Sequence, residues 1–206
     1  MRNNFVLGLS ILALHAKADN KKCRALAMSG GANYGAWEAG IMWGLTHYGN
    51  PEDFAWDVIT GVSAGAINTA ATSVFAVGDE VKMSEFVSDT WASLTTEDIW
   101  RQWPEGPVKA LTNRQGLLDD SYGLDYITKI LKPFGKLTDR RFTVAAVNVD
   151  KGVYETFDQT NTTFEELPQA ALSSGSIPTV FPNQHFKGMN LMDGGTVWNI
   201  NVSSAI

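Results

Sequence analysis

The stretch that decides the fold is AWDVITGVSAGAINTA, residues 55–70. It starts as a short apolar run with β-branched residues, which predicts a buried strand. It then turns sharply between two glycines, Gly61 and Gly65, and continues as an Ala-rich segment that favours a helix. A strand, a tight turn and a helix with a serine at the apex are the context of a nucleophile elbow.

Ser63, at the apex of this turn, is the candidate nucleophile. Side chains at positions 61 and 65 would collide across so tight a turn, which explains the two glycines. The Ser63 hydroxyl would stand beside a helix N-terminus, whose free N–H groups favour developing negative charge. The five-residue pattern alone is weak, because a glycine-lined turn with an ordinary N-terminal serine also produces it. The strand–turn–helix context favours the nucleophile.

Residues 1–18 have the pattern of an export signal. Arg2 supplies a positive charge, residues 5–14 form an apolar run, and Ala16-Lys17-Ala18 is an A-x-A cleavage site. The run is too short to span a bilayer, and no later run is long and apolar enough to do so. We predict cleavage after Ala18, a secreted protein, and no transmembrane segment.

The mature chain, residues 19–206, predicts one acidic domain. Once the signal's two basic residues are removed from the 16 in the chain, 22 acidic residues leave a net charge of −8. This charge, without any basic run, argues against nucleic acid and against electrostatic docking on anionic lipid. Cys23 is the only cysteine, so an internal disulfide is impossible and we expect a free thiol. Asn161 and Asn201 begin N-glycosylation sequons.

A second glycine-rich turn, SGGANYG at residues 29–35, lies between a predicted strand at 24–28 and a predicted helix at about 36–48. Such a turn points backbone N–H groups at whatever lies above the helix start, so it could hold an oxyanion or a phosphate. Phosphate fits less well, because neither the G-x-G-x-x-G nor the P-loop pattern is present. A third possibility is close helix–strand packing. The helix has one apolar face, made of Trp37, Ile41, Gly44, Leu45 and Tyr48.

The rest of the chain alternates helices and strands. A less regular section, residues 95–120, follows Trp91 and holds Trp100 and Trp103; we expect a cap packed on the core, or alternatively a lipid-facing rim. Asp193 comes at a strand end before two glycines, where it could also be a turn residue. Helices are predicted at 80–94, 121–131 and 164–174, strands at 141–149 and 153–157, and a short hairpin at 185–192.

Four motifs in this order resemble the patatin-like phospholipases, over essentially the whole mature chain. They are SGGANYG at 29–35, GVSAG at 61–65, AALSSGSIP at 170–178 with Phe181-Pro182, and DGG at 193–195. The chain departs from the family pattern at two positions. Ala32 stands where a third glycine is common, and Tyr34 stands where Arg or Lys is frequent.

The resemblance implies a three-layer α/β/α sandwich around a largely parallel sheet. It also implies lipid acyl-ester hydrolysis through an acyl-enzyme, with Ser63 as nucleophile and Asp193 as general base, without cofactor or metal. The oxyanion hole would be formed by Gly30, Gly31, Ala32 and Ala64, and the motif glycines are Gly35, Gly61, Gly65, Gly194 and Gly195. Family domains usually continue further after this last motif, so we expect the 19–206 domain to be shortened at its C-terminal end.

The histidines agree with a Ser–Asp dyad. In α/β-hydrolases the base follows the acid in the chain, but His47 and His185 both precede Asp193. Two alternatives remain open. One is a non-catalytic lipid-binding or storage protein on the same fold, and the other is an esterase or thioesterase for small acyl groups.

Overall fold

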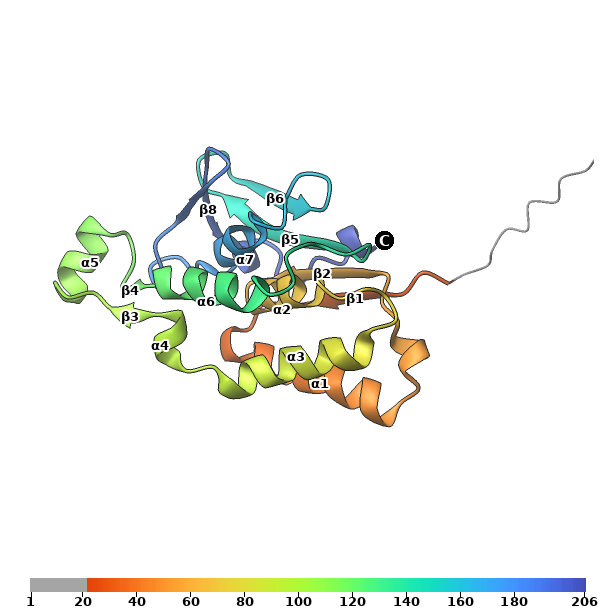
Figure 1. Ribbon diagram of the computed structural model, residues 1–206. Coiled ribbons are helices and arrows are strands. Elements are labelled where there is room, and N and C mark those ends of the chain that lie inside the picture. Colours follow the sequence, from red (N-terminus) through yellow and green to blue (C-terminus); the bar gives the residue numbers. More distant parts are fainter. Residues whose placement is uncertain (1–21) are drawn as a thin grey trace, which may run out of the picture.

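The computed structural model describes residues 22–206, so the predicted signal, residues 1–18, lies outside the described part. The main sheet consists of β1 (Ala25–Met28), β2 (Val58–Val62), β5 (Arg141–Asn148), β6 (Val153–Asp158), β7 (Gln184–Phe186) and β8 (Met189–Asp193). Its order is β1-β2-β5-β8-β7, with β6 also paired to β5 (Figure 1). β1, β2, β5 and β7 run in one direction, and β6 and β8 run against them. The expected α/β fold with a largely parallel sheet is confirmed.

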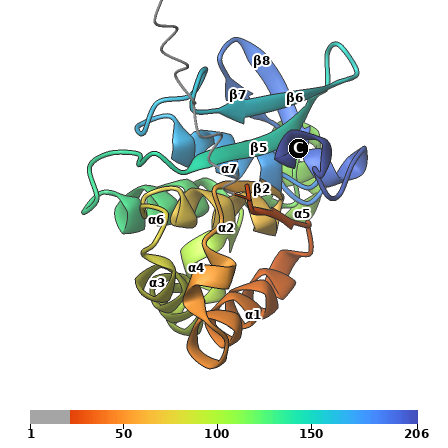
Figure 2. The same ribbon diagram turned by 90° about the vertical axis from the view of Figure 1, so that its right-hand side faces the viewer.

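The main helices lie together on one face of this sheet (Figure 2). Ile59 of β2 and Phe142 of β5 are register partners, so their side chains point to the same face. Ile59 belongs to a core cluster with α1, α2 and α3, and Phe142 to a cluster with α2, α6 and α7. The bounds are α1 Gly35–Tyr48, α2 Ala64–Thr72, α3 Glu80–Ser93, α6 Ser121–Leu131 and α7 Leu167–Gly175.

On the opposite face of the sheet, the segment 194–206 packs against β1, β2 and β5; it contains the short 3-10 helices η3 (Gly194–Thr196) and η4 (Ser203–Ala205). The Thr60 hydroxyl donates to the Asn201 carbonyl at 2.7 Å and fastens this segment to β2. In the described residues, the three-layer arrangement therefore has one helical outer layer and one formed by this segment.

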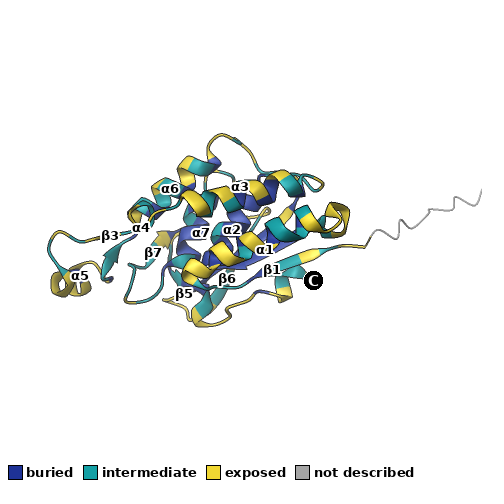
Figure 3. Cartoon of the chain, turned by 90° about the horizontal axis from the view of Figure 1, so that it is seen from below, coloured by how far each residue is buried: buried dark blue, intermediate teal, exposed yellow. Residues whose placement is uncertain are grey.

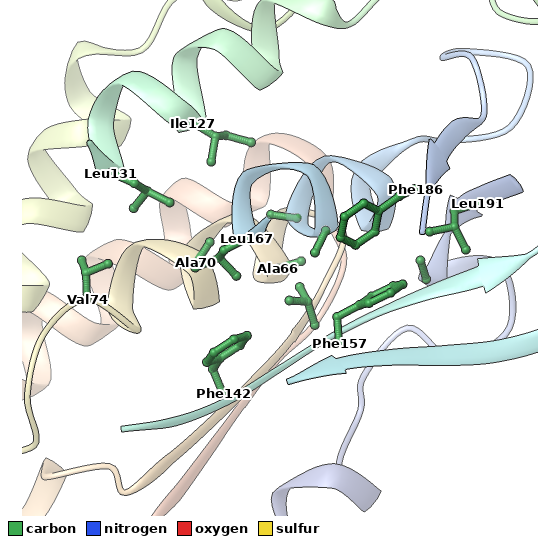
Figure 4. Packing of buried hydrophobic residues seen from close by; sticks show 14 residues of the cluster. Ala66, Ala70, Val74, Ile127, Leu131, Phe142, Phe157, Leu167, Phe186 and Leu191 are labelled. Atoms are coloured by element: carbon green, nitrogen blue, oxygen red, sulfur yellow. The ribbon is translucent and has the colours of Figure 1, made fainter. Parts of the chain in front are cut away.

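Small side chains explain why α2 lies so close to the sheet. Ala66 and Ala70 (Figure 4) are fully buried in the larger core cluster, which also contains Val144 and Ala146 of β5. Alanine combines high helix propensity with a side chain short enough for close helix–sheet contact. The Ala-rich segment after the elbow therefore fixes both the helix and its distance from the sheet.

The orientation of α1 differs from the expectation. Its buried side is formed by Ala39, Met42 and Thr46, whereas Trp37, Ile41 and Tyr48 of the predicted apolar face are exposed. Figure 3 shows exposed positions along α1. The helix is apolar on both sides, so spacing alone could not identify the inner one. The side with Ala39, Met42 and Thr46 faces inward because α1 packs on α3 and α2, where Ala39 and Met42 join the core cluster that contains Ile59.

The section 95–120 forms several short elements that project from one end of the molecule, with α5 farthest out (Figure 1). Trp91, Trp100 and Trp103 are half-buried, and the Trp103 indole donates to the Gly116 carbonyl at 3.2 Å. Trp91 and Trp100 also line the apolar cavity described below, so the indole rings lie between the core and that cavity. The elements are α4 Thr96–Ile99, β3 Arg101–Gln102, α5 Pro107–Asn113 and β4 Leu118–Asp119.

The long strand β5 brings two distant parts of the chain together. One edge of β5 pairs with β6, and the other edge pairs with both β2 and β8. On that second edge Ala145 pairs with Val62 of β2, and the next residue, Ala146, pairs with Asp193 of β8. β2 and β8 run in opposite directions along this edge and end beside each other. The residue after β2, Ser63, therefore lies next to the last residue of β8.

Candidate active site

Ser63 adopts the backbone conformation expected of an elbow. Its φ of 54° and ψ of −121° lie in a region that non-glycine residues rarely occupy, at a cost of about 1–3 kcal/mol. A Cβ at Gly61 would lie 2.0 Å from the Gly65 carbonyl oxygen, and one at Gly65 would lie 2.7 Å from the Met28 carbonyl oxygen. Both glycines are therefore required for the turn to close against β1.

Ser174, on α7, holds the elbow from the other side. Its hydroxyl accepts a hydrogen bond from the Ser63 amide at 2.8 Å and donates one to the Ala145 carbonyl at 2.5 Å. This buried side chain ties the strained residue to the central strand. Sequence reasoning assigned Ser174 no role, although it lies within the AALSSGSIP motif.

Asp193 is buried beside Ser63, and the structure positions its carboxylate tightly. Oδ1 accepts the Gly195 amide at 2.7 Å, and the Asp193 amide donates to the Ser176 carbonyl at 2.9 Å. Burial raises the pKa of Asp193, while hydrogen bonds from the Ser63 side chain and the Gly195 amide oppose that shift. A buried carboxylate with a raised pKa that contacts a serine hydroxyl is a better base than an exposed one.

The glycine-rich loop reaches the same place but corrects one assignment. The Gly30 amide donates to the Asn199 carbonyl at 2.9 Å, so Gly30 does not offer an N–H to an oxyanion. A Cβ at Gly30 would lie 2.9 Å from the Ser63 Cβ, so the absence of a side chain at Gly30 allows the loop to lie close to Ser63. Within residues 22–206, the amides of Gly31, Ala32 and Ala64 have no hydrogen-bond acceptor.

Ala32 occupies the left-handed region, with a φ of 50°. This conformation costs an L-residue roughly 1–2 kcal/mol and costs glycine little, in keeping with glycine being common here in related loops. Because the Ala32 amide has no acceptor among the described residues, it is open to a ligand.

Asn199 is a site-forming residue that sequence reasoning missed. The Asn199 Nδ2 donates to the Gly30 carbonyl at 3.0 Å, and the Gly30 amide donates to the Asn199 carbonyl. A Cβ at Gly30 or at Gly195 would lie within 2.5 Å of Asn199 Oδ1. Asn199 thus joins the glycine loop to the Asp193 turn, and only the spacing after the DGG motif could have signalled it.

A largely apolar cavity of about 470 Å³ opens beside Ser63. Its walls come from η1 (Ala32–Tyr34), α2, α3, α4 and α6, together with the loop after α7. Side chains that line it include Ile67, Trp91, Ile99, Trp100, Tyr126 and Phe181. A site of this size and character suits an aliphatic chain.

A polar network connects this cavity wall to the glycine loop. The Trp91 indole donates to Asn68 Oδ1 at 2.7 Å, and Asn68 Nδ2 donates to the Gly35 carbonyl and to Glu38, each at 3.0 Å. Glu38 Oε1 accepts the Ser29 amide at 3.0 Å. A Cβ at Gly35 would lie 2.4 Å from the Trp91 ring, so this glycine allows the indole to pack on the loop.

The histidines of the described chain lie elsewhere. His47 contacts Glu85 at 3.2 Å and stacks on Trp43, and His185 is exposed on β7. Neither lines the cavity beside Ser63. Across residues 22–206, no helix has the length and hydropathy needed to cross a membrane.

Comparisons with known proteins identify the family of this chain. Residues 26–206 match the patatin-like phospholipase family, whereas a comparison with curated proteins found no match. Among solved structures, VipD from Legionella pneumophila is similar, with a TM-score of 0.51 and 15% identity. The match covers 87% of this chain and 47% of VipD, so the chain spans about half the length of that protein. The shared fold and the family match over most of the sequence show that the chain belongs to the patatin-like phospholipase family.

Proposed function

We propose that this protein hydrolyses acyl esters of lipids with a Ser63–Asp193 dyad. Family membership supports lipid acyl hydrolysis in general. The observation that carries the specific proposal is the meeting of β2 and β8, which sets a strained serine against a buried carboxylate at the mouth of an apolar cavity.

In the first half-reaction, Asp193 takes the hydroxyl proton of Ser63 while the serine oxygen attacks the ester carbonyl carbon. The carbonyl oxygen becomes an oxyanion, which the amides of Gly31, Ala32 and Ala64 would stabilise. The intermediate collapses to an acyl-enzyme, and the alcohol leaves with the proton that Asp193 returns. The acyl chain would occupy the cavity beside Ser63.

In the second half-reaction, water replaces the alcohol. Asp193 takes a proton from water, the resulting oxygen attacks the acyl carbon, and Ser63 leaves with that proton. Each carboxylate step is the reverse of its counterpart in the first half, so one base suffices and no histidine is required.

Fluorophosphonate labelling tests this proposal without knowledge of the natural lipid. The probe places a phosphoryl oxygen where the oxyanion would form, and it reacts with an activated serine. We expect the adduct to map to Ser63, and Asp193→Asn to lower the labelling rate by at least about a hundredfold while the protein stays folded. Ser174→Ala keeps both dyad members but removes the hydroxyl that holds the Ser63 amide, so it should slow labelling less than Asp193→Asn does.

Three results would contradict the proposal. They are no labelling of the folded protein, an adduct on another serine, or unchanged labelling of Asp193→Asn. The first, combined with retained lipid affinity, would favour a non-catalytic lipid-binding protein. Labelling with hydrolysis of short esters alone would favour an esterase for small acyl groups.

A further inference from the structure

A groove of about 410 Å³ lies on the far side of the glycine loop from the apolar cavity. It is lined by Ser29, Gly30, Gly31, Tyr34, Trp37 and Glu38. The next loop residue, Ala32, lines the cavity instead, so the loop separates the two hollows. Because Gly30 lies against Ser63, the groove is close to the nucleophile.

Two aromatic side chains form the outer wall of the groove. Tyr34 and Trp37 are 71% and 68% exposed, and residues three apart at a helix start lie on the same side. Neither ring is needed for the core, because α1 buries Ala39 and Met42 instead. Both rings are free to present a face to a ligand.

The charge inside the groove is negative and has no cationic partner. Glu38 accepts one hydrogen bond from the Ser29 amide and one from the Asn68 side chain, both of which are neutral donors. No lysine or arginine lines the groove, and none in residues 22–206 forms an ion pair with Glu38. The groove therefore favours a cationic ligand.

We propose that this groove binds the trimethylammonium end of a lipid headgroup, so that choline-bearing acyl lipids are substrates. Aromatic faces attract quaternary ammonium groups, and a nearby carboxylate adds to that attraction. A primary ammonium donates three hydrogen bonds, whereas the protein already uses one acceptor site on each Glu38 oxygen, so part of the acceptor capacity of Glu38 is taken. A trimethylammonium group has no N–H, so it leaves no hydrogen-bond donor without a partner on entering.

The location fits the chemistry of the proposed hydrolase, on which this inference rests. An ester has an acyl part and an alcohol part, on opposite sides of the carbonyl that Ser63 attacks. With the acyl chain in the cavity, the alcohol part would extend past Gly30 and Gly31 toward Tyr34 and Trp37. The groove would then determine headgroup preference without taking part in bond cleavage.

A competition assay tests this inference. Phosphatidylcholine and phosphatidylglycerol with identical acyl chains are mixed in neutral detergent micelles at equal mole fraction, and the two initial rates are compared. We expect wild type to prefer phosphatidylcholine. Replacing both Tyr34 and Trp37 by Leu should lower that preference about tenfold, because each exposed cation–π contact is worth a factor of about two to five.

Matched variants separate headgroup binding from other roles. Tyr34→Phe and Trp37→Phe keep an aromatic face, so their preference for phosphatidylcholine should stay within about twofold of the wild-type preference. Tyr48→Leu removes an aromatic residue that is 84% exposed on the same helix but does not line the groove, so the preference should not change. Hydrolysis of a short ester without a headgroup should be the same in all variants.

An unchanged lipid ratio in the double Leu variant would overturn the inference. So would equal losses on both lipids, which would instead indicate general contact with the lipid surface. If wild type neither hydrolyses esters nor labels at Ser63, the proposed function fails by itself. Binding of dibutyryl phosphatidylcholine to Ser63→Ala, measured by calorimetry against dibutyryl phosphatidylglycerol, still decides the headgroup question.

Discussion

At the scale of single residues, the site depends on side chains that hold backbone atoms in place. Ser174 fixes the elbow amide, and Asn199 fixes both polar groups of Gly30. Neither contacts the reacting atoms in the proposed mechanism. Their contribution is to hold Ser63 and the glycine loop in fixed positions relative to each other.

Asn199→Ala tests this positioning role. The substitution removes the Nδ2 bond to the Gly30 carbonyl, which is worth about 1 kcal/mol, and leaves the backbone bond intact. We expect fluorophosphonate labelling of Ser63 to slow about five- to tenfold. Because Asn199 is exposed, the melting temperature should change little.

Ser203→Ala is the control, because it removes a hydroxyl bonded to Asn201 in the same segment without touching the loop. Its labelling rate should equal that of wild type. Wild-type labelling of Asn199→Ala would show that the backbone bond alone positions Gly30.

At the scale of elements, the two ends of the sheet have different roles. The C-terminal end of β2 carries Ser63, while the segments leading into β2 and β5 are joined at the opposite end by Arg140. This fully buried guanidinium donates to Glu80 at 2.7 Å and to the carbonyls of Trp56, Phe75 and Ala76. Such complete pairing is what a buried charge requires.

Arg140→Met should destabilise the fold without altering the site. The change leaves the Glu80 carboxylate and three carbonyls without their partner, and breaking a buried pair costs about 3–5 kcal/mol. Urea unfolding should show this loss, whereas the labelling rate of the folded fraction should be unchanged. Arg141→Met, at the next and exposed position, should cost under about 0.5 kcal/mol. Equal stability of the two variants would contradict the role of Arg140.

At the scale of the whole molecule, buried carboxyls give stability a defined pH dependence. Burial raises the pKa of Asp120 from 3.8 to about 6, and it also raises the pKa values of Glu38 and Asp193. The folded protein therefore holds these protons more tightly than the unfolded chain. The free energy of unfolding therefore falls as pH rises from about 4 to 6, because the buried carboxyls lose their protons over this range. Above pH 6 this loss of stability is complete.

Asp120→Asn should remove the largest share of the stability loss that ionisation of the buried carboxyls causes. An amide oxygen can still accept from the Ser176 hydroxyl and the Gln184 side chain, but it carries no charge. We expect the free energy of unfolding of the variant at pH 7 to be higher than that of wild type by on the order of 3 kcal/mol, and this difference to shrink toward pH 4. Urea titrations across this range measure it, with exposed Asp125→Asn as control. A difference independent of pH would contradict the explanation.

The sequence by itself determined the local structure of this protein. Apolar runs, glycine spacing and the Ala-rich segment predicted the elbow and most strands and helices, because strand and helix formation follow from periodicity and backbone freedom. The same reasoning predicted helix 164–174, which begins at Leu167 in the structure.

Tertiary structure decided what periodicity could not. Only the sharing of one β5 edge by β2 and β8 sets Ser63 beside Asp193, which lie far apart in the chain. Packing alone decided that α1 buries Ala39 rather than Trp37, and that Asn199 takes the Gly30 amide away from the predicted oxyanion hole. These outcomes depend on contacts between distant segments, and a local pattern of residues carries no information about which distant segment will lie against it.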